Sequence, residues 1–439
     1  MSLNQNKPLI SVIIPTFNRA DLLKLALNSL TLQTIEKEKF EVIVINDGST
    51  DNTIQICEKF SEQLNLKYIT ISNSGISAAK NLGLFSSTAS ICFFFDDDDV
   101  ADKNLLAEHI KTHTKYPDES VAVLGYTTWS SRIKVSFLMD YVINIGYDLF
   151  CYNNLEHEES LDYTFFWGGR SSCKKNFLVK HGVFNQGFRF GSEDIELGFR
   201  LKKHGLKVIY NENAKSYMVR PITFEQFINR KKKQGKSLDL FLRLHPTDEV
   251  RDYAKVQIAK KKMEYIDEYF EDNIKKVNYL ESFLLSKITD EERITIKNKL
   301  VSLYRWVFEA SKIKGYYEEF EIKEAKIKND LDLKTRKYKS EDLKYLNIKF
   351  SNILKKPDVK QNILIIDPAL PMYDRASGSL RLFQIIKGLV ELKFHVTFIS
   401  QNDTYAGQYV PQLIEMGVEV YAGDPHALHG KSESHIMPK

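Results

Sequence analysis

The first hundred residues alternate short apolar runs with longer segments of helical spacing. The runs are rich in β-branched or aromatic residues, so we expect strands that are buried on both faces, at residues 9–14, 40–45, 66–71 and 91–95. Between them the spacing predicts helices at residues 20–33, 53–64 and 76–85. Strands that alternate with helices predict a parallel sheet with right-handed crossovers, which binds ligands beyond the carboxyl ends of its strands.

The pattern changes after about residue 240. Residues 247–349 are rich in Lys, Glu, Ile and Tyr, and their only glycine is Gly315. A stripe with three- and four-residue steps predicts one apolar face of a long helix, formed by Met263, Ile266, Phe270, Val277, Leu280 and Leu284. We interpret this stripe as packing within the chain, with homo-oligomerisation through the helical region as the alternative.

The carboxyl-terminal part predicts a second α/β unit. Residues 355–358 have the composition of a linker, and a strand, a helix and a strand are expected after them, at 362–367, 379–392 and 395–400. We therefore expect three parts, made of residues 1–240, 241–355 and 356–439.

Composition narrows the class of protein. With 439 residues, 43% hydrophobic and 27% charged, the chain is expected to fold into several globular domains. The net charge of +4 gives no reason to expect a nucleic-acid partner. The four cysteines form no CxxC pair, which is typical of a reducing compartment. No run has the length of a membrane span, so we expect a cytoplasmic protein, and docking at the inner face of the membrane stays open.

The sharpest chemical signal is the run Asp96 to Asp99, which follows the fourth predicted strand directly. Asp102 is expected to be the N-cap of a helix that begins near Lys103, which leaves the four adjacent acids unexplained. Adjacent carboxylates repel one another unless a cation offsets them, and hard divalent cations prefer carboxylate oxygens. The run therefore predicts a divalent metal ion that handles a phosphate.

Polar residues also follow the other three predicted strands. Gly48 and Gly75 are expected to form turns, whereas neither Asp47 nor Lys80 is needed by a turn. All four strand ends should therefore contribute polar side chains to one crevice.

The combination PTFNRADLL, VIVINDGSTDNT, NSGISAAKN, FFFDDDDV and GSEDIELGFRLKKHG resembles the family-2 inverting glycosyltransferases of the GT-A fold. The resemblance covers roughly residues 8–240. It implies an α/β fold, the Rossmann-like and mostly parallel sheet of nucleotide-diphospho-sugar transferases. The pattern of the chain adds the helical segment and a partial Rossmann-like unit after it. The last segment, from Asn362 onwards, looks like the beginning of a GT-B glycosyltransferase.

The resemblance also implies roles for individual residues. It places the nucleoside diphosphate sugar against Pro15, Thr16, Asn18, Arg19, Asp47, Gly75, Lys80, Asp96 and Asp97. Asp98 and Asp96 would hold Mn²⁺ or Mg²⁺, and the acceptor would lie against Trp167, Gly168 and Gly169. Asp194 would be the general base, beside Glu193, at the start of a helix for which Ser192 is the expected N-cap.

Two features depart from the family pattern. No histidine occurs in residues 215–219, where many relatives carry a further metal ligand, so the metal would rest on Asp98, the diphosphate and water. The QxxRW motif of processive synthases is missing from residues 227–235, which disfavours long-chain synthesis.

The resemblance predicts transfer of a sugar, from a UDP-sugar in the first place, to a glycan or lipid-linked glycan in cell-surface polysaccharide biosynthesis. A nucleotidyltransferase acting on sugar phosphates is one alternative. It would need a triphosphate loop rich in Gly and Arg or Lys where this chain has PTFNRAD. A non-catalytic cation-binding module is the other alternative, and it would not need Asp194.

Overall fold

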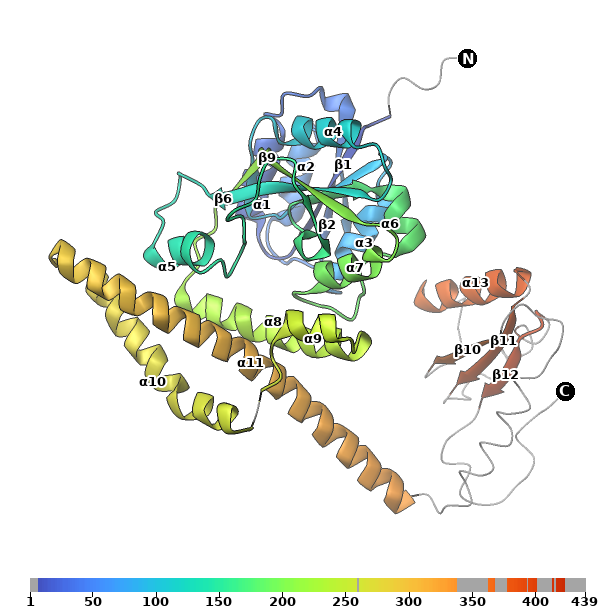
Figure 1. The fold of residues 1–439 in the computed structure, drawn as a ribbon. Helices are drawn as coiled ribbons and strands as arrows, with labels where there is room; N and C mark the ends of the chain where they lie inside the picture. Colours follow the sequence, from blue (N-terminus) through green and yellow to red (C-terminus); the bar gives the residue numbers. More distant parts are fainter. Residues whose placement is uncertain are drawn as a thin grey trace. The chain divides into compact units, whose positions relative to one another are not determined.

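The computed structural model describes residues 7–258, 260–337, 362–367, 377–392, 394–400, 413 and 416–422. The chain divides into two compact units, Met1–Lys326 and Ile327–Lys439 (Figure 1). The predicted linker at 355–358 lies outside the described residues. The boundaries of the three predicted parts therefore stay a prediction.

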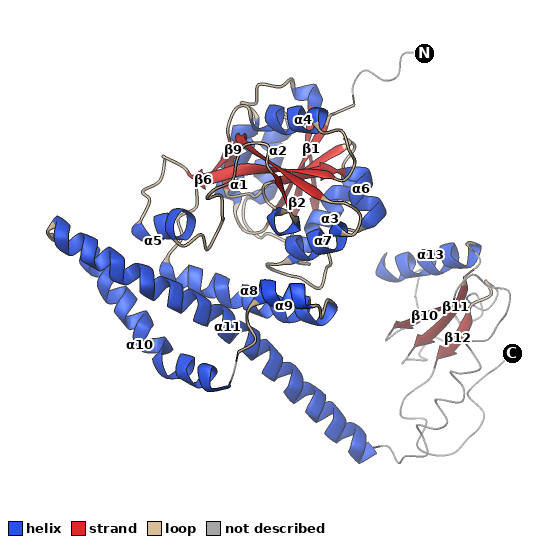
Figure 2. Ribbon diagram, in the orientation of Figure 1, coloured by secondary structure: helices blue, strands red, loops and turns tan. Residues whose placement is uncertain are grey.

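A mixed, mostly parallel sheet forms the centre of the first unit (Figure 2). Its strands run in the order β3 (Leu66–Thr70), β2 (Phe40–Asn46), β1 (Ile10–Thr16), β4 (Ile91–Phe94), β8 (Ser171–Lys174), β6 (Val121–Trp129), β9 (Lys207–Met218) and β5 (Asp99–Ala101), with β7 (Ser160–Leu161) beside β9. The four strands expected from the sequence pair in parallel, as predicted. β8 lies antiparallel between β4 and β6, and this reversal brings residues just before Ser171 to the end of β4.

Helices cover both faces of this sheet. They are α1 (Ala20–Leu30), α2 (Thr53–Ser61), α3 (Ile76–Ser86), α4 (Leu105–Lys115), α5 (Phe137–Asp140), α6 (Lys175–His181) and α7 (Glu193–Lys202). Side chains alternate along β1, so Val12 and Ile14 share a core with α1, α2 and α4, whereas Ile13 packs with residues of α3, α6 and α7. β1, β2 and β4 are thus buried from both sides, which is why their runs are almost continuously apolar.

Two local expectations were wrong. The third strand, β3, is mostly exposed rather than buried on both faces, because it is the edge strand of the sheet and only β2 pairs with it. The helix after the acidic run begins at Leu105 with Asn104 as its N-cap. Asp102 instead accepts a hydrogen bond from the backbone N–H of Asn104, at 3.0 Å, in the turn before the helix.

Further helices follow the sheet. They are α8 (Phe224–Leu244), α9 (Asp248–Ala254), α10 (Lys260–Leu284) and α11 (Asp290–Lys337), and α11 continues past the end of the first unit. Ile266, Phe270 and Val277 of the predicted stripe are buried in one apolar cluster with Tyr304 of α11 and Phe227 of α8. The interpretation of the stripe as packing within the chain is therefore confirmed for these residues.

The crossing of α8 and α11 depends on two glycines. A Cβ atom at Gly235 would lie 1.9 Å from the carbonyl oxygen of Lys312, and one at Gly315 would lie 2.0 Å from that of Lys232. Each helix therefore presents a glycine to the backbone of the other. This explains why a long segment with no other glycine keeps one at position 315.

The second unit contains a small parallel sheet, β10 (Asn362–Asp367), β11 (His395–Ser400) and β12 (Glu419–Ala422), with helix α13 (Ser377–Glu391). Ile386 of the helix is buried with Val396 and Phe398 of β11. The predicted strand, helix and strand are confirmed. The likeness of this unit to the start of a GT-B domain stays a prediction.

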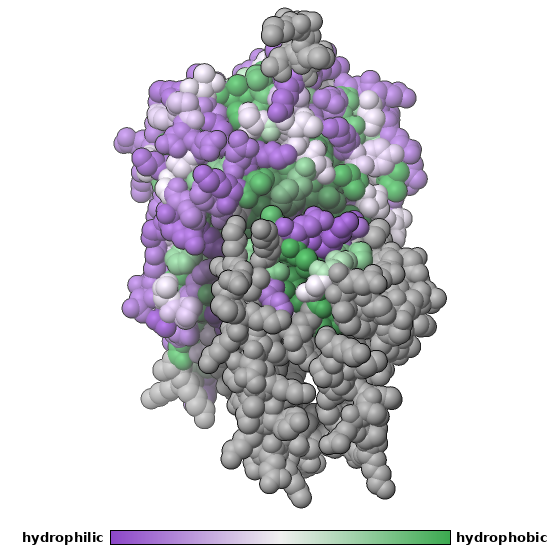
Figure 3. Space-filling view, turned by 90° about the vertical axis from the view of Figure 1, so that its right-hand side faces the viewer, coloured by the Kyte–Doolittle hydropathy of each residue, from purple (hydrophilic) through white to green (hydrophobic). Residues whose placement is uncertain are grey.

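Polar and charged side chains cover most of the described surface that Figure 3 shows, with smaller apolar patches between them. Within the described ranges, no helix combines the length and the apolar character that crossing a membrane requires.

We predict that Gly315→Ala destabilises the first unit by about 1–3 kcal/mol, because the new methyl group must push two packed helix backbones apart. Chemical denaturation followed by circular dichroism measures this change. Gly388→Ala in α13 is the matched control, since nothing lies within 4 Å of the added Cβ there. An unchanged unfolding midpoint in Gly315→Ala would contradict the close crossing.

Candidate active site

The acidic run forms a tight turn between β4 and β5 rather than an extended segment. The backbone N–H of Asp99 donates to the carbonyl oxygen of Asp96, at 3.3 Å. Asp99 then pairs with Met218 at the end of β9. The turn directs the four carboxylates toward different partners, so each has its own environment.

Arg170 neutralises the two outer acids of the turn. Its Nη1 atom donates to Asp96 at 2.8 Å, and its Nη2 atom donates to Asp99 at 3.2 Å. The guanidinium group also stacks on the ring of Phe150, with 4.1 Å between its Cζ atom and the ring centroid. Asp99 is fully buried and Arg170 nearly so, which makes this a desolvated ion pair that depends on both partners.

The two inner acids of the turn are held by other groups. Asp97 accepts hydrogen bonds from the hydroxyl of Thr16 and from Arg19, at 2.7 and 2.8 Å. Asp98 receives Arg220 Nε at 2.8 Å and Arg19 Nη1 at 3.4 Å, both on its Oδ2 atom. Three arginines from three different loops therefore offset the negative charge of the run.

Asn18 and Asp47 build the loops at the ends of the first two strands. Asn18 has a positive φ of 51°, and its side-chain oxygen accepts from the backbone N–H of Thr50 at 2.8 Å. Asp47 accepts from the backbone N–H groups of Ser74 and Gly75, at 2.7 and 2.9 Å. The expectation that no turn needs Asp47 was therefore wrong, since its carboxylate holds the turn that opens α3. As predicted, Gly75 adopts a positive φ, of 89°.

Lys80 lies among acids that sequence reasoning did not pair with it. Its Nζ atom donates to Glu193 at 2.9 Å, and both side chains are almost fully buried. The resemblance placed Lys80 beside the base and diphosphate of a donor, whereas the structure places its ammonium group at the start of α7. Ser192 precedes α7 in a left-handed conformation and its side chain makes no capping bond, so the expected side-chain cap is absent.

The Gly168–Gly169 turn brings the two halves of the site together. A Cβ atom at Gly169 would lie 2.2 Å from Asp96 Oδ2, and one at Gly168 would lie 2.5 Å from Lys80 Nζ. The backbone N–H of Gly168 also donates to Asp194 Oδ2 at 2.9 Å. The acidic turn and the start of α7 therefore meet on opposite sides of two residues that have no side chain.

Burial sets the protonation of three acids in this site. It raises the pKa of Asp194 to about 6, with Glu193 adding to the shift and Lys80 opposing it. Burial raises the pKa of Asp97 to about 6, with Arg19 opposing it. Burial also raises the pKa of Asp99, to about 8, and Arg170 opposes this shift.

A divalent cation fits this site only in part. Within the described part of the chain, no three His, Cys, Asp or Glu side chains converge to hold a metal ion. Asp96 gives its Oδ2 atom to Arg170 and Asp98 gives its Oδ2 atom to two arginines, so each keeps Oδ1 without a partner among the described residues. The two predicted metal ligands can therefore supply one carboxylate oxygen each, and the other ligands would have to come from a bound diphosphate and water.

Sequence reasoning missed Arg170, Arg220 and Arg230. Arg230 lies on α8 beside Phe190, and its Nε atom is buried without a hydrogen-bond partner. The sequence carried a weak signal for two of them. Arg170 follows the Gly–Gly turn directly. Arg220 directly follows residues 215–219, where many relatives carry a histidine.

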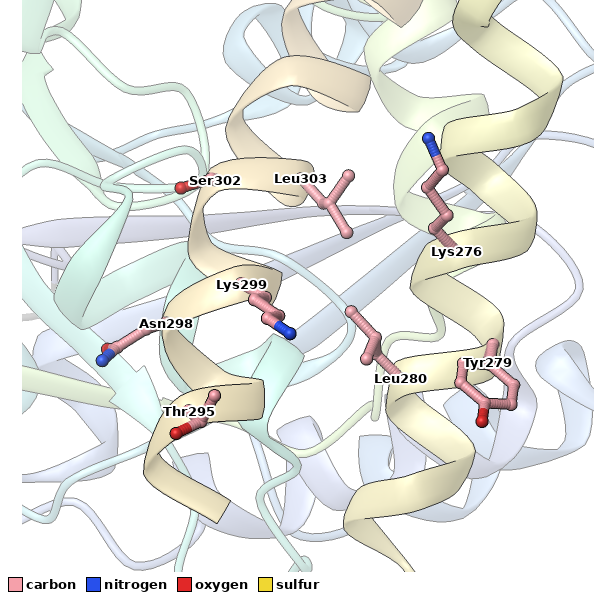
Figure 4. Close-up of a pocket in the computed structure, with 8 residues that line it drawn as sticks. All are labelled: Lys276, Tyr279, Leu280, Thr295, Asn298, Lys299, Ser302 and Leu303. Atoms are coloured by element: carbon pink, nitrogen blue, oxygen red, sulfur yellow. The ribbon is translucent and has the colours of Figure 1, made fainter. Parts of the chain in front are cut away.

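A groove between α10 and α11 is separate from this arrangement. It has a volume of about 670 Å³ and is lined by Lys276, Tyr279, Leu280, Thr295, Asn298, Lys299, Ser302 and Leu303 (Figure 4). None of the predicted site residues lines it. The candidate site is therefore the polar cluster at the strand ends and not this groove.

Residues 11–177 match the family model described as glycosyl transferase family 2. This part of the chain is therefore similar to glycosyl transferase family 2 domains. Together with the mostly parallel sheet, the match confirms the predicted fold class. The matched residues include the acidic turn and the Gly168–Gly169 turn, and they end before Glu193.

Relatives that match this part of the chain are named as glycosyltransferases or synthases. Validoxylamine A glucosyltransferase from Streptomyces hygroscopicus subsp. jinggangensis is 29% identical over 240 residues, which cover 47% of this chain and 54% of that protein. Chondroitin synthase from Escherichia coli is 28% identical over 241 residues, which cover 48% of this chain and 35% of that protein. The chain spans about half the length of the first relatives it matches.

Solved structures with a similar chain path have low sequence identity. S. aureus TarS in complex with UDP is 18% identical with a TM-score of 0.41, over 72% of this chain and 91% of that one. The mannosyltransferase PcManGT from Pyrobaculum calidifontis, in complex with GDP-Man and Mn²⁺, is 18% identical with a TM-score of 0.46, over 72% and 87%.

We predict that Lys80→Met destabilises the protein by about 3–5 kcal/mol, because it leaves the buried carboxylate of Glu193 without its cation. The double variant Lys80→Met with Glu193→Gln should recover much of this loss. Urea denaturation of the two single variants and the double variant measures the coupling. If the two single losses simply add, the pair does not interact as described.

Proposed function

We propose that this chain is an inverting glycosyltransferase. It transfers a sugar from a nucleoside diphosphate sugar, in the first place a UDP-sugar, to a hydroxyl of a glycan or lipid-linked glycan. The observation that carries the proposal is the meeting of the acidic turn with Asp194 across Gly168 and Gly169. The family match favours this activity over nucleotidyl transfer, and a role for Asp194 favours it over a non-catalytic module.

The donor side of the site lies at the ends of β1, β2 and β4. Thr16, Asp47 and the acidic turn are the predicted contacts of the nucleoside and ribose. Pro15 precedes Thr16 in β1, and Asn18, Arg19 and Gly75 lie in the loops around them. Asp98 would hold Mn²⁺ or Mg²⁺ through its remaining oxygen, with Asp96 behind it. Such an ion would stabilise the charge that develops on the diphosphate as it leaves.

Asp194 is suited to accept the proton of the attacking hydroxyl. Its side chain is only partly buried, and Gly168 and Ile195 donate backbone N–H groups to its two oxygens, at 2.9 and 2.8 Å. These bonds fix the carboxylate in place. With a pKa of about 6 it is ionised at neutral pH and remains basic enough to accept a proton.

The reaction is then one in-line displacement. The acceptor oxygen forms a bond to the anomeric carbon while the bond from that carbon to the diphosphate breaks. The acceptor proton passes to Asp194, the bonding electrons leave with the diphosphate, and the anomeric configuration inverts. No covalent enzyme intermediate is required.

The acceptor would lie against Trp167, Gly168 and Gly169. The named relatives are a validoxylamine A glucosyltransferase in one case and a chondroitin synthase in the other. We retain the glycan or lipid-linked glycan of a cell surface as the proposed acceptor. Peripheral membrane association, a cytoplasmic location at the inner face of the membrane and homo-oligomerisation stay predictions.

A donor screen tests the proposal. UDP-, dTDP- and GDP-sugars are titrated into the protein by calorimetry, with and without Mn²⁺, and slow hydrolysis of each bound donor is followed by release of the nucleoside diphosphate. Binding and hydrolysis of one donor class are expected. A protein that binds Mn²⁺ but none of these donors would be a cation-binding module instead.

We predict that Asp194→Asn leaves donor affinity and the melting temperature close to those of the wild type, and lowers transfer by on the order of a hundred- to ten-thousand-fold. Asparagine keeps the shape of the side chain but cannot accept the proton. Glu193→Gln is the matched control and should lose less activity. Full activity in Asp194→Asn together with loss in Glu193→Gln would assign the base to Glu193.

The raised pKa of Asp194 predicts the pH dependence. A base works only when ionised, so transfer should fall as the pH drops through about 6, rather than through the ordinary aspartate value of about 4. Rates at saturating donor from pH 5 to 8 measure this change. The donor affinity is measured at each pH as well, because Asp97 is a predicted donor contact whose pKa is also about 6. A rate that stays constant down to pH 5 would contradict the assignment.

A further inference from the structure

Only one nitrogen atom of the Arg220 guanidinium group takes part in the ion pair with Asp98. The bond uses its Nε atom, at 2.8 Å, and the side chain remains 37% exposed. Its two Nη atoms have no acceptor among the described residues. A guanidinium group held by Nε presents its paired Nη donors as a fork, which is the geometry that phosphate oxygens match.

The backbone keeps Arg220 beside the acidic turn. The N–H of Val219 donates to the carbonyl oxygen of Asp98 at 3.0 Å, next to the pairing of Asp99 with Met218. The position of Arg220 therefore follows from the β5–β9 ladder and not from a flexible loop. The backbone beside Arg220 is therefore held by the acidic turn, and the guanidinium group is held by the Asp98 carboxylate.

Arg230 adds a second cation with unmet bonding capacity. Its Nε atom is buried and unpartnered, and no ion pair to it is found among the described residues. Burial lowers the pKa of Arg230, and the charges of Arg170 and Arg220 lower it further. Guanidinium groups that repel one another in a buried setting are stabilised when an anion binds between them.

Four arginines surround the acidic turn. Arg19, Arg170 and Arg220 form ion pairs with its acids, and the charges of Asp96 and Asp98 also act on Arg230. The strand end that looks strongly acidic in the sequence is therefore offset by guanidinium groups in the folded protein. Arg220 and Arg230 keep donors without a partner among the described residues.

We propose that Arg220 binds the diphosphate of the donor through its Nη atoms while its Nε atom stays on Asp98, with Arg230 as the second cation of this diphosphate site. This rests on the proposed function and names a binding residue that the motif comparison did not assign. Asp98 then has two tasks, since Oδ2 positions Arg220 and Oδ1 stays free for a cation. Nucleoside diphosphate binding should therefore persist in part when divalent ions are removed.

Calorimetry with UDP and with GDP, in EDTA and with Mn²⁺, tests this on the full chain. The wild type should bind one of them in EDTA, and Arg220→Ala should bind it on the order of ten- to a hundred-fold more weakly in either condition. Arg220→Lys should fall between them, because an ammonium group keeps the charge but lacks the fork. Arg251→Ala, which breaks an ion pair on the surface of α9, is the matched control and should bind as the wild type does.

Uridine or guanosine, which lack phosphate, separate a local effect from a folding effect. Ligand-observed NMR should show that Arg220→Ala binds the nucleoside as the wild type does. Equal diphosphate affinity in Arg220→Ala and the wild type would overturn the assignment, and so would a parallel loss of nucleoside and diphosphate binding. If the wild type bound neither diphosphate under any condition, the donor site and the proposed function would both be wrong.

Discussion

The site depends on how four adjacent carboxylates at the end of a buried strand are neutralised. Isolated charges in such a place are unstable, because burial removes the water that would solvate them. Arg170 forms ion pairs with Asp96 and Asp99. Arg19 forms one with Asp97, and Arg220 forms one with Asp98. The acidic turn can therefore form before any metal ion is bound. The arginines that neutralise its charge are also side chains that can bind a phosphate.

This constraint explains several features around the turn. β8 runs antiparallel beside β4, which places Arg170, one residue before that strand, at the acids. Gly169 must lack a side chain because Asp96 occupies the space of its Cβ, and Gly168 must lack one because of Lys80. The same two glycines bring Asp194 within hydrogen-bond reach of the turn, so the donor side and the proposed base form one connected arrangement.

The helical region is connected to this arrangement through α8. Arg230 and Gly235 both lie on α8, and at Gly235 the backbone of α11 comes into close contact with α8. Phe227 on α8 is also fully buried against the aromatic residues of α11. The helices after residue 240 therefore pack against the helix that carries Arg230.

The sequence by itself determined the parallel strands, the turns at their ends, the acidic run, the Gly–Gly turn and the apolar stripe of α10. These follow from periodicity and turn chemistry, which act over a few residues. Only the tertiary structure decided that Lys80 pairs with Glu193, that Asp47 holds the turn at Gly75, and that arginines 74 to 122 residues away reach the acidic turn. An ion pair forms wherever the fold brings opposite charges within a few ångströms, and that distance depends on strand order and crossovers, which no local pattern encodes.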